Sequence, residues 1–414
     1  RVWDITQGSQ DVVVAVVDTG ADLSHPDLSA NAWVNPGEVA GNGVDDDSNG
    51  FVDDINGWNF FSKNNLVFEN SFDDRHGTHV SGTIGAAGNN SLGVAGVAWR
   101  VKLMSVKIIG RKNGEIEGTT ADAIKGINYV AAQRNRGINL RAINASWGGA
   151  EKSQALRDAI AAAGQAGVLF VTSAGNGGDD NFGDDMDQSP DYPAAWSQEV
   201  SSIVSVAALD HTDRLTPYSN YGHQTVDVAA PGGVCNCSNG IYSTLPGGAY
   251  GYAFGTSMSA PHVTGIAALL WSVDTSLTPA QVKQRIVRTA HPVTSLASKI
   301  VSSGRASAFN ALTNTIPQDI PPSIRFVNID KKAVTIDGIG YLKGSTVIEV
   351  NGVALASTKF DEAYKLANAS YTRIKVKLGK PGIRSTFPSG VPVSVVIHNT
   401  TTGERSTAVF ITRG

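Results

Sequence analysis

The chain has 414 residues, of which 45 are glycines, and it carries a formal net charge of -4. A composition of 41% hydrophobic and 17% charged residues is typical of a loop-rich globular protein, and the length predicts a large domain plus a smaller one. The small negative charge gives no reason to expect nucleic acid as a partner, and no apolar run approaches the roughly 18 residues that a membrane span needs.

From residue 11 to about 312 the sequence alternates between strand and helix patterns. The first strand, DVVVAVVD, is a continuous β-branched run, which is typical of a strand covered on both faces. This alternation predicts an α/β domain with a doubly wound, mainly parallel sheet and helices on both faces. In chain order we expect strands and helices at 11–18 (strand), 76–88 (helix), 100–109 (strand), 118–137 (helix), 140–147 (strand), 152–167 (helix), 168–175 (strand), 200–208 (strand), from about 255 (helix) and at 278–290 (helix).

The pattern changes at NTIPQDIPPS, where prolines cluster and long helical patterns stop. Short alternating runs follow, and Asn351 and Gly352 between apolar runs are a strong hairpin signal. We therefore predict a small all-β, immunoglobulin-like sandwich. The predicted organisation is a catalytic domain at 1–313, a Pro-rich linker at 314–322 and the sandwich at 323–414.

Four polar residues stand at predicted strand ends or helix starts. Asp18 ends the first strand, and His76 begins the first long helix. Asn176 follows a later strand, and Ser257 lies before the apolar run IAALLW. Each has an ordinary explanation as a turn or a helix cap. Together they supply a nucleophile, a base, an orienting carboxylate and an oxyanion donor, because carboxyl ends of parallel strands meet at one edge.

Two other kinds of site are disfavoured by the motifs. His76 and His79 lie three residues apart and could bind a metal, but the H-E-x-x-H pattern of zinc proteases is absent. Ser257 lies in GTSMS rather than in G-x-S-x-G, which argues against an esterase or lipase of the α/β-hydrolase type. The chain order Asp, His, Ser also differs from the order in those hydrolases.

Three blocks, VVDTGADLSHPDL, HGTHVSGTI and GTSMSAPHVTG, give the chain its resemblance to the subtilisin family of serine proteases over roughly residues 1 to 312. The resemblance implies that Asp18 orients His76, and that His76 removes the proton of Ser257. Ser257 then forms an acyl-enzyme, while Asn176 and the Ser257 backbone N–H bind the oxyanion. It also implies an endopeptidase that acts on proteins or peptides, by default with broad specificity.

The resemblance further implies where substrate binds. The segment SWGG would pair with substrate as an added β-strand, and the first specificity pocket would lie between SWGG and SAGN. Asp191, in the acidic stretch 179–191, falls near the pocket floor by analogy, where it could favour Lys or Arg; a solvated acidic loop or a cation site is the open alternative. The candidate substrate-binding residues are Ser146, Trp147, Gly148, Gly149, Ser173, Ala174, Gly175 and Asp191.

A first calcium site is predicted in DDDSNGFVDDIN. Oxygen ligands two residues apart, followed by a glycine, are typical of a calcium loop, although Asn56 stands where an EF-hand has Glu. An exposed acidic turn is the alternative. The candidate ligands are Asp45, Asp47, Asn49, Phe51 and Asp53.

A second calcium site is implied by the family resemblance alone, through GNNSLGVAG. The implied ligands are Asp27, the Asn90 side chain and the carbonyls of Gly88, Leu92 and Val94. In the family another ligand comes from well before the first strand. Here Arg1 is only 17 residues before Asp18, so that ligand is in question.

Cys235 and Cys237 are the only cysteines. They are too few for a structural zinc site, and the sequence leaves open whether they form a bond across one residue or stay as thiols. The redox compartment is therefore not predicted from cysteine usage.

The C-terminal sandwich weakly resembles the IPT/TIG group of immunoglobulin-like domains. Subtilisin relatives are typically exported behind a propeptide, so we expect a secreted, monomeric, mature form whose propeptide was a partner before maturation. Two alternatives are a processing protease for basic sites and an adhesion protein that binds through its β-domain.

Overall fold

The computed structural model describes residues 1–413 except 179, 181, 318–321, 356–357, 361–369, 401–402, 404 and 407. The predicted linker at 314–322 and the acidic residue Asp179 therefore lie partly or wholly outside the described residues. In the described part of the chain, no helix combines the length and hydropathy that crossing a membrane requires.

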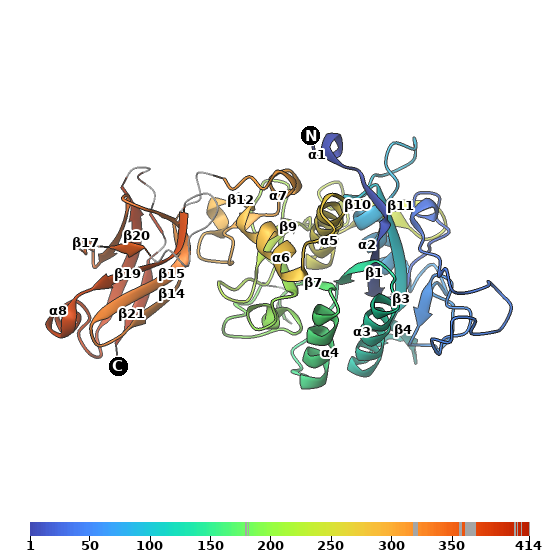
Figure 1. Cartoon of the computed structure of the whole chain (residues 1–414), viewed down its shortest axis with the longest axis horizontal. Coiled ribbons are helices and arrows are strands. Elements are labelled where there is room, and N and C mark those ends of the chain that lie inside the picture. Colours follow the sequence, from blue (N-terminus) through green and yellow to red (C-terminus); the bar gives the residue numbers. More distant parts are fainter. Residues whose placement is uncertain are drawn as a thin grey trace.

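A nine-stranded sheet forms the centre of the larger region (Figure 1). Each strand runs parallel to its neighbours except β12, which pairs antiparallel with β13 at one edge. The predicted doubly wound, mainly parallel sheet is thus confirmed. From one edge to the other the strands are β12 (His291–Pro292), β13 (Gly304–Arg305), β9 (Val228–Pro231), β8 (Ile203–Leu209), β7 (Leu169–Ser173), β6 (Leu140–Ala145), β1 (Gly8–Asp18), β3 (Arg100–Lys107) and β2 (Gly57–Asn59).

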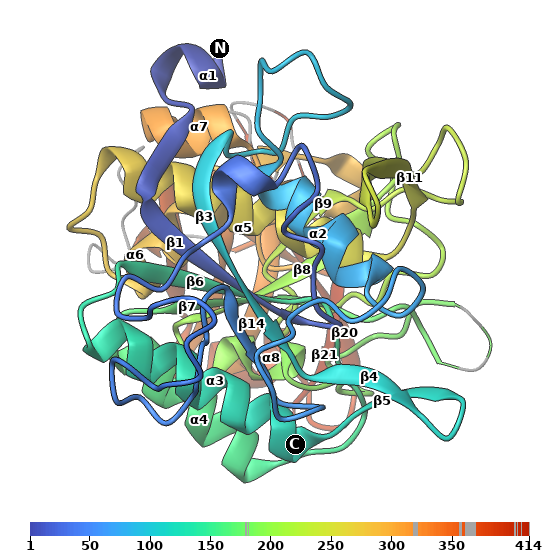
Figure 2. The same cartoon turned by 90° about the vertical axis from the view of Figure 1, so that its right-hand side faces the viewer.

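Alternating residues of β1 enter two different cores. Val12, Val14 and Val16 pack with α2 (Arg75–Gly85) and α5 (Thr256–Val273) on one face. Val13 and Val17 pack with α3 (Thr120–Asn135) and α4 (Gln154–Gln165) on the other. Figure 2 shows α2 and α5 on one side of the sheet and α3 and α4 on the opposite side. Burying each valine side chain stabilises the fold by about 1.5–3 kcal/mol, which explains the β-branched run in the centre of the sheet.

Shorter elements complete this region. Two antiparallel hairpins project from it, one formed by β4 and β5 and the other by β10 and β11. The remaining elements are α1 (Val2–Ile5), η1 (Ser29–Asn31), β4 (Ile109–Lys112), β5 (Glu115–Gly118), η2 (Ala194–Gln198), β10 (Ile241–Leu245), β11 (Ala249–Ala253), α6 (Pro279–Arg288), η3 (Thr294–Leu296) and α7 (Ala308–Thr313).

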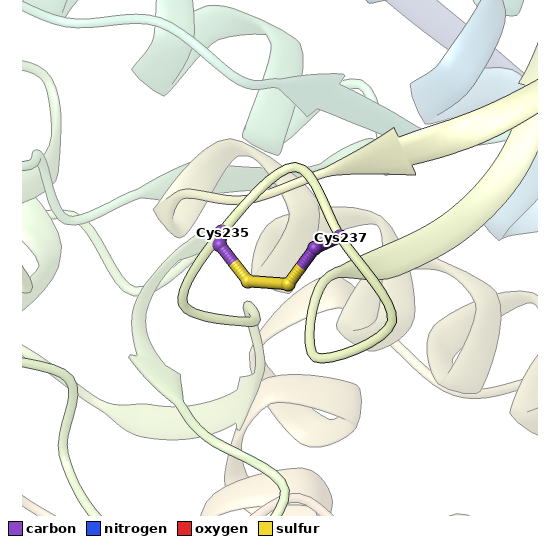
Figure 3. The surroundings of a disulfide bond; sticks show 2 residues. All are labelled: Cys235 and Cys237. Carbon is purple, nitrogen blue, oxygen red and sulfur yellow. A yellow bond between two sulfur atoms is a disulfide. The ribbon is translucent and has the colours of Figure 1, made fainter.

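Cys235 and Cys237 form a disulfide in the loop that joins β9 to β10 (Figure 3). This answers the question that the sequence left open. The same loop lies beside the entry to α5, because the N–H of Gly255 donates to the Gly232 carbonyl at 3.0 Å.

Among its described residues, the C-terminal region forms two antiparallel four-stranded sheets and the helix α8, next to the β12 end of the large sheet (Figure 1). Both sheets contribute to one apolar core, so they pack face to face. The predicted hairpin at Asn351 and Gly352 joins β16 to β17, with positive φ at both residues. The elements are β14 (Ser323–Ile329), β15 (Ala333–Leu342), β19 (Ser370–Lys377) and β18 (Lys359–Phe360), then β17 (Val353–Ala354), β16 (Thr346–Val350), β20 (Pro392–Asn399) and β21 (Val409–Thr412), and α8 (Gly379–Thr386).

Candidate active site

The carboxyl end of β1 brings a carboxylate against a histidine. β1 ends at Asp18, and α2 begins one residue before His76. Asp18 Oδ1 lies 2.7 Å from His76 Nδ1 and also accepts a 2.7 Å hydrogen bond from the Thr19 N–H. The Asp18 side chain is fully buried, whereas 35% of the His76 side chain is exposed. His76 thus has one ring nitrogen fixed by a buried carboxylate and a partly exposed ring.

The carboxylate changes the proton affinity of the ring. Burial alone lowers the pKa of His76, but the negative charge of Asp18 and its hydrogen bond outweigh that effect. The pKa of His76 therefore lies above its ordinary value of 6.5. The buried carboxylate thus stabilises the imidazolium that forms when His76 accepts a proton.

Close backbone approach fixes the position of α2. The Gly77 N–H donates to Thr19 Oγ1 at 3.0 Å, and a Cβ on Gly77 would lie 2.2 Å from the Gly20 carbonyl oxygen. Below this turn, the buried Lys107 at the end of β3 donates to the Asp74 carboxylate and to the Thr19 carbonyl. Sequence analysis missed Lys107 and Asp74. The one feature of the sequence that could have indicated this ion pair is a lysine at the end of an apolar strand.

Ser257 lies in the first turn of α5, which packs against α2. Its hydroxyl donates to the Ser146 carbonyl at 3.2 Å, and the Ser146 hydroxyl donates to the Ser257 carbonyl at 2.8 Å. Within the described chain the Ser257 hydroxyl makes no hydrogen bond to His76; in unliganded hydrolases this contact is often long. The structure therefore joins Asp18 directly to His76 and joins Ser257 to the segment that starts at Ser146.

Asn176 is held with its amide nitrogen toward the start of α5. Its Oδ1 accepts from the Thr256 N–H at 2.9 Å and from the Thr256 hydroxyl at 2.8 Å. Its Nδ2 is 3.3 Å from the point where a Cβ of Gly255 would stand, and Gly255 has a φ of +134° that favours glycine. The amide N–H groups thus lie beside Gly255, two residues before Ser257, and no described residue accepts a hydrogen bond from them. Thr256 was missed by sequence analysis because its partner is 80 residues away.

The two predicted walls of the substrate site also lie at this end of the sheet. Trp147 donates from its ring nitrogen to the Val17 carbonyl at 2.8 Å, which fixes the segment 146–149 beside β1. The N–H and carbonyl of Gly149 are both paired with Tyr192. Ser173 ends β7, and the Gly175 N–H donates to the Thr256 hydroxyl at 3.2 Å.

Asp191 lies between these two walls. Its Oδ1 is 3.1 Å from the Cβ position of Gly148, and its Oδ2 is 2.7 Å from that of Gly175. Oδ1 is buried and accepts no hydrogen bond from any described residue. Burial raises the pKa of Asp191 more than the neighbouring N–H groups of Gly149 and Tyr192 lower it. The two glycines leave room for a carboxylate that has no cationic partner among the described ion pairs.

The first predicted calcium loop brings three carboxylates together. Oxygens of Glu38, Asp45 and Asp47 lie within 4.8 Å of one another, and they form the only such cluster of acidic, His or Cys side chains among the described residues. Sequence analysis missed Glu38, since its distance from the loop carries no spacing signal. Hard oxygen ligands fit calcium or another hard cation.

The other predicted ligands of this loop, Asn49, Phe51 and Asp53, are not part of this carboxylate cluster. The Asp53 carboxylate accepts hydrogen bonds from the N–H groups of residues 41–43, and Asn49 Oδ1 accepts from the Phe51 N–H. The Phe51 ring packs edge-on against Tyr129. Asp53 and Asn49 Oδ1 therefore organise the loop in this structure, while Glu38 joins Asp45 and Asp47.

The second predicted calcium site is closed by hydrogen bonds. The Asp27 carboxylate accepts from Asn90 Nδ2 at 2.7 Å, from the Val94 N–H at 3.1 Å and from the Tyr250 hydroxyl at 2.8 Å. Asn90 Oδ1 accepts from the Leu92 N–H, and the Trp99 ring lies over Gly88. The Asp27 carboxylate and the Asn90 amide oxygen thus already accept hydrogen bonds, and the acidic cluster found among the described residues does not include Asp27.

His79 behaves as a structural residue. It is buried, its Nε2 lies 2.9 Å from the Ile241 carbonyl, and burial lowers its pKa to about 4. No cluster of possible metal ligands among the described side chains contains a histidine. The geometry thus offers no support for zinc at His76 and His79.

Comparison with known proteins gives the family. A model of the subtilase family matches residues 9–316. Subtilisin-like protease 1 of Plasmodium berghei (strain Anka) is 34% identical over 322 residues, which cover 75% of this chain and 51% of that protein. Thermitase of Thermoactinomyces vulgaris is 33% identical over 312 residues, which cover 75% of this chain and 92% of thermitase. A solved protease structure from Pseudoalteromonas arctica is 32% identical with a TM-score of 0.56, and the match covers 76% of this chain and 92% of that one.

The chain thus spans about half the length of the Plasmodium relative and most of the length of thermitase. The region matched by the family model includes Asp18, His76, Asn176 and Ser257. These residues follow one another in the order expected from the motifs. The resemblance to subtilisin-like serine proteases, and the fold it implied, are confirmed. This chain belongs to the subtilase family.

Proposed function

We propose that this protein is a serine endopeptidase in which Asp18, His76 and Ser257 act as a catalytic triad. The observation that carries the proposal is the 2.7 Å contact between the buried Asp18 and the partly exposed His76, on the helix that packs against α5. His76 removes the proton of Ser257 Oγ as that oxygen attacks the scissile carbonyl carbon. The same proton then passes to the leaving amine, and water hydrolyses the acyl-enzyme by the same route.

Asn176 and the Ser257 backbone N–H stabilise the oxyanion in this proposal. Support comes from the two hydrogen bonds by which Thr256 holds the amide oxygen of Asn176, which leave its N–H groups as the donors. Donors that are fixed before the reaction need no reorganisation when charge develops. Losing one such donor typically lowers kcat about 100- to 1,000-fold.

Broad specificity is the default, with substrate paired along the backbone of Trp147 and Gly148. A second candidate, a protease that prefers Lys or Arg before the cleaved bond, is favoured by the buried Asp191 Oδ1 between Gly148 and Gly175. A carboxylate without a cationic partner at the floor of a pocket attracts a cationic side chain.

We also propose one calcium ion at Glu38, Asp45 and Asp47, where it would bridge three carboxylates, one of them also paired with Arg136, and tie the 36–54 loop together. The closed arrangement around Asp27 gives no such support to a second ion. Secretion, a monomeric state and an earlier propeptide remain proposals from family habit. An adhesive role for the sandwich is the remaining alternative.

The proposed activity is tested with an internally quenched peptide whose two termini are blocked, so that only an endopeptidase can cleave it. Wild-type protein should cleave the peptide, His76→Ala should lose cleavage, and His211→Ala, which changes an exposed histidine elsewhere, should retain it. Equal cleavage by wild type and His76→Ala would reject the triad. A folded wild type that does not cleave would leave the sandwich as the place to look for function.

A further inference from the structure

Asn220 is a buried residue of the 210–227 loop, only 3% exposed, that lies against the strand-end segment carrying Asn176. Its backbone N–H donates to the Gly175 carbonyl at 3.0 Å, and its Nδ2 donates to the Ala174 carbonyl at 3.1 Å. Its Oδ1 accepts from the Gly177 N–H at 2.9 Å. Three hydrogen bonds from one residue thus hold the backbone on both sides of Asn176.

We propose that Asn220 is a positioning residue for the oxyanion site: it fixes the backbone of Asn176 so that the amide donor stands beside Ser257. This inference rests on the proposed oxyanion role of Asn176. Thr256 fixes the side-chain amide, and Asn220 fixes the main chain that carries it. The two sets of contacts come from different segments and complement each other.

The chemistry of the contact explains why an asparagine is needed. Only a side-chain amide combines a two-donor nitrogen with an acceptor oxygen on so short a side chain. Here the oxygen accepts from both Gly177 and Asp184, while the nitrogen serves Ala174. Gly175 completes the fit, because its φ is +100° and a Cβ there would lie 2.4 Å from the Asn220 amide nitrogen.

Loss of the Asn220 contacts should affect catalysis because the oxyanion donor must be held in place before the reaction. A buried polar group that loses its hydrogen-bond partner is left unsatisfied, which costs free energy. We therefore expect the 174–177 backbone to shift when the Asn220 side chain is removed. A donor displaced from the developing oxyanion contributes less in the transition state, and the substrate complex is little affected. Asn220 should therefore act on kcat through Asn176.

The test is a double-mutant cycle between Asn220→Ala and Asn176→Ala, with kcat measured on a peptide amide and active enzyme counted by titration. We expect Asn176→Ala to lower kcat about 100- to 1,000-fold and Asn220→Ala alone about 10-fold. Added to Asn176→Ala, the Asn220 change should cost less than about 2-fold, since coupled residues are not additive. The matched control is Asn31→Ala, which removes another buried asparagine with side-chain hydrogen bonds, to the Gly85 and Trp99 carbonyls, and should have the same effect in both backgrounds.

Asn220→Asp gives a second cycle if Asn220→Ala folds poorly, because it keeps the acceptor for Gly177 and loses the donor to Ala174. An Asn220 effect of the same factor in both backgrounds would overturn the positioning role and leave the oxyanion role of Asn176 intact. A wild-type kcat in Asn176→Ala would instead reject the oxyanion role itself, and this inference with it.

Discussion

Two regions of the molecule each bring a carboxylate against a histidine. At the end of the large sheet, Asp18 lies 2.7 Å from His76; on the sandwich, Glu349 lies 3.0 Å from His398. Glu349 also binds Arg405, so its charge is matched within the sandwich. In the described ion pairs Asp18 has no such cation, and His76 is its partner.

The difference shows that a carboxylate–histidine contact becomes a candidate site only through its surroundings. Parallel strands deliver Asp18, Ser146 and Asn176 to one edge, and α5 brings Ser257 to the same edge. The antiparallel sheets of the sandwich spread their polar side chains over an outer face, where Glu349, His398 and Arg405 satisfy one another.

The largest expected effect is the loss of activity in Asp18→Asn. Without the carboxylate the imidazolium is not stabilised and the ring tautomer is wrong, so kcat should fall about 10,000-fold. The matched change in the sandwich, Glu349→Gln, should leave kcat within about 2-fold of wild type, because no reacting group lies beside it. Comparable kcat losses in both variants would remove the distinction between the two regions.

The acidic limb of the pH profile should report His76. Its raised pKa means that kcat/KM falls, as pH decreases, from a point above pH 6.5, where the base becomes protonated. His79, with a pKa of about 4, and His262, whose pKa burial also lowers, stay neutral in that range. Asp18→Asn should move the limb to lower pH in its residual activity, and an unmoved limb would assign it to another group.

The same raised pKa of His76 affects the free energy of unfolding in the opposite direction: activity falls as pH decreases, whereas this contribution to stability falls as pH rises. A group whose folded pKa is raised stabilises the fold below its unfolded pKa, and this contribution is lost as pH rises through the folded pKa. Urea unfolding between pH 5 and pH 9 should therefore show a smaller dependence on pH in His76→Gln than in wild type. An identical dependence in both proteins would mean that the Asp18 contact does not favour the protonated ring.

A smaller effect is expected from Asp191. If it selects for cations, kcat/KM for Lys before the cleaved bond relative to Leu should fall about 10-fold or more in Asp191→Asn. Because burial raises the pKa of Asp191, the preference should also weaken as pH falls, when the carboxyl gains a proton. A Lys-to-Leu ratio that is unchanged by the substitution would support broad specificity.

The smallest effect is expected on stability from calcium. An ion present at 100 times its Kd stabilises the folded state by about 2.7 kcal/mol, which corresponds to a Tm rise of about 5 °C in the large region only. Glu38→Gln should abolish this rise, whereas Asp46→Asn, in the same loop but outside the cluster, should retain it. A calcium response that survives Glu38→Gln would place the ion elsewhere.

Sequence patterns predicted the features that depend on near neighbours. The β-branched run before Asp18 predicted a central strand, and the blocks around His76 and Ser257 predicted the family. Lys107 and Asn220 were missed because each contacts a distant segment, and Glu38 was missed because the calcium-loop pattern starts only at Asp45.

Similar limits apply to three other features of the sequence. Asp27 fits a calcium pattern in sequence, yet the Tyr250 hydroxyl, 223 residues away, occupies one of its oxygens. The Cys235 and Cys237 pairing could not be decided from two cysteines, since a bond across one residue depends on the conformation of the loop. The substrate role of Gly149 stays a prediction, with its backbone paired to Tyr192.

The most direct test of the account is covalent labelling of Ser257 by a fluorophosphonate, followed by peptide mapping. Wild-type protein should label stoichiometrically at Ser257, and Ser257→Ala should not label. Ser259→Ala, which changes a buried serine in the same helix, should label like wild type. A folded wild type that does not label, or a label that persists in Ser257→Ala, would contradict the proposed catalytic site.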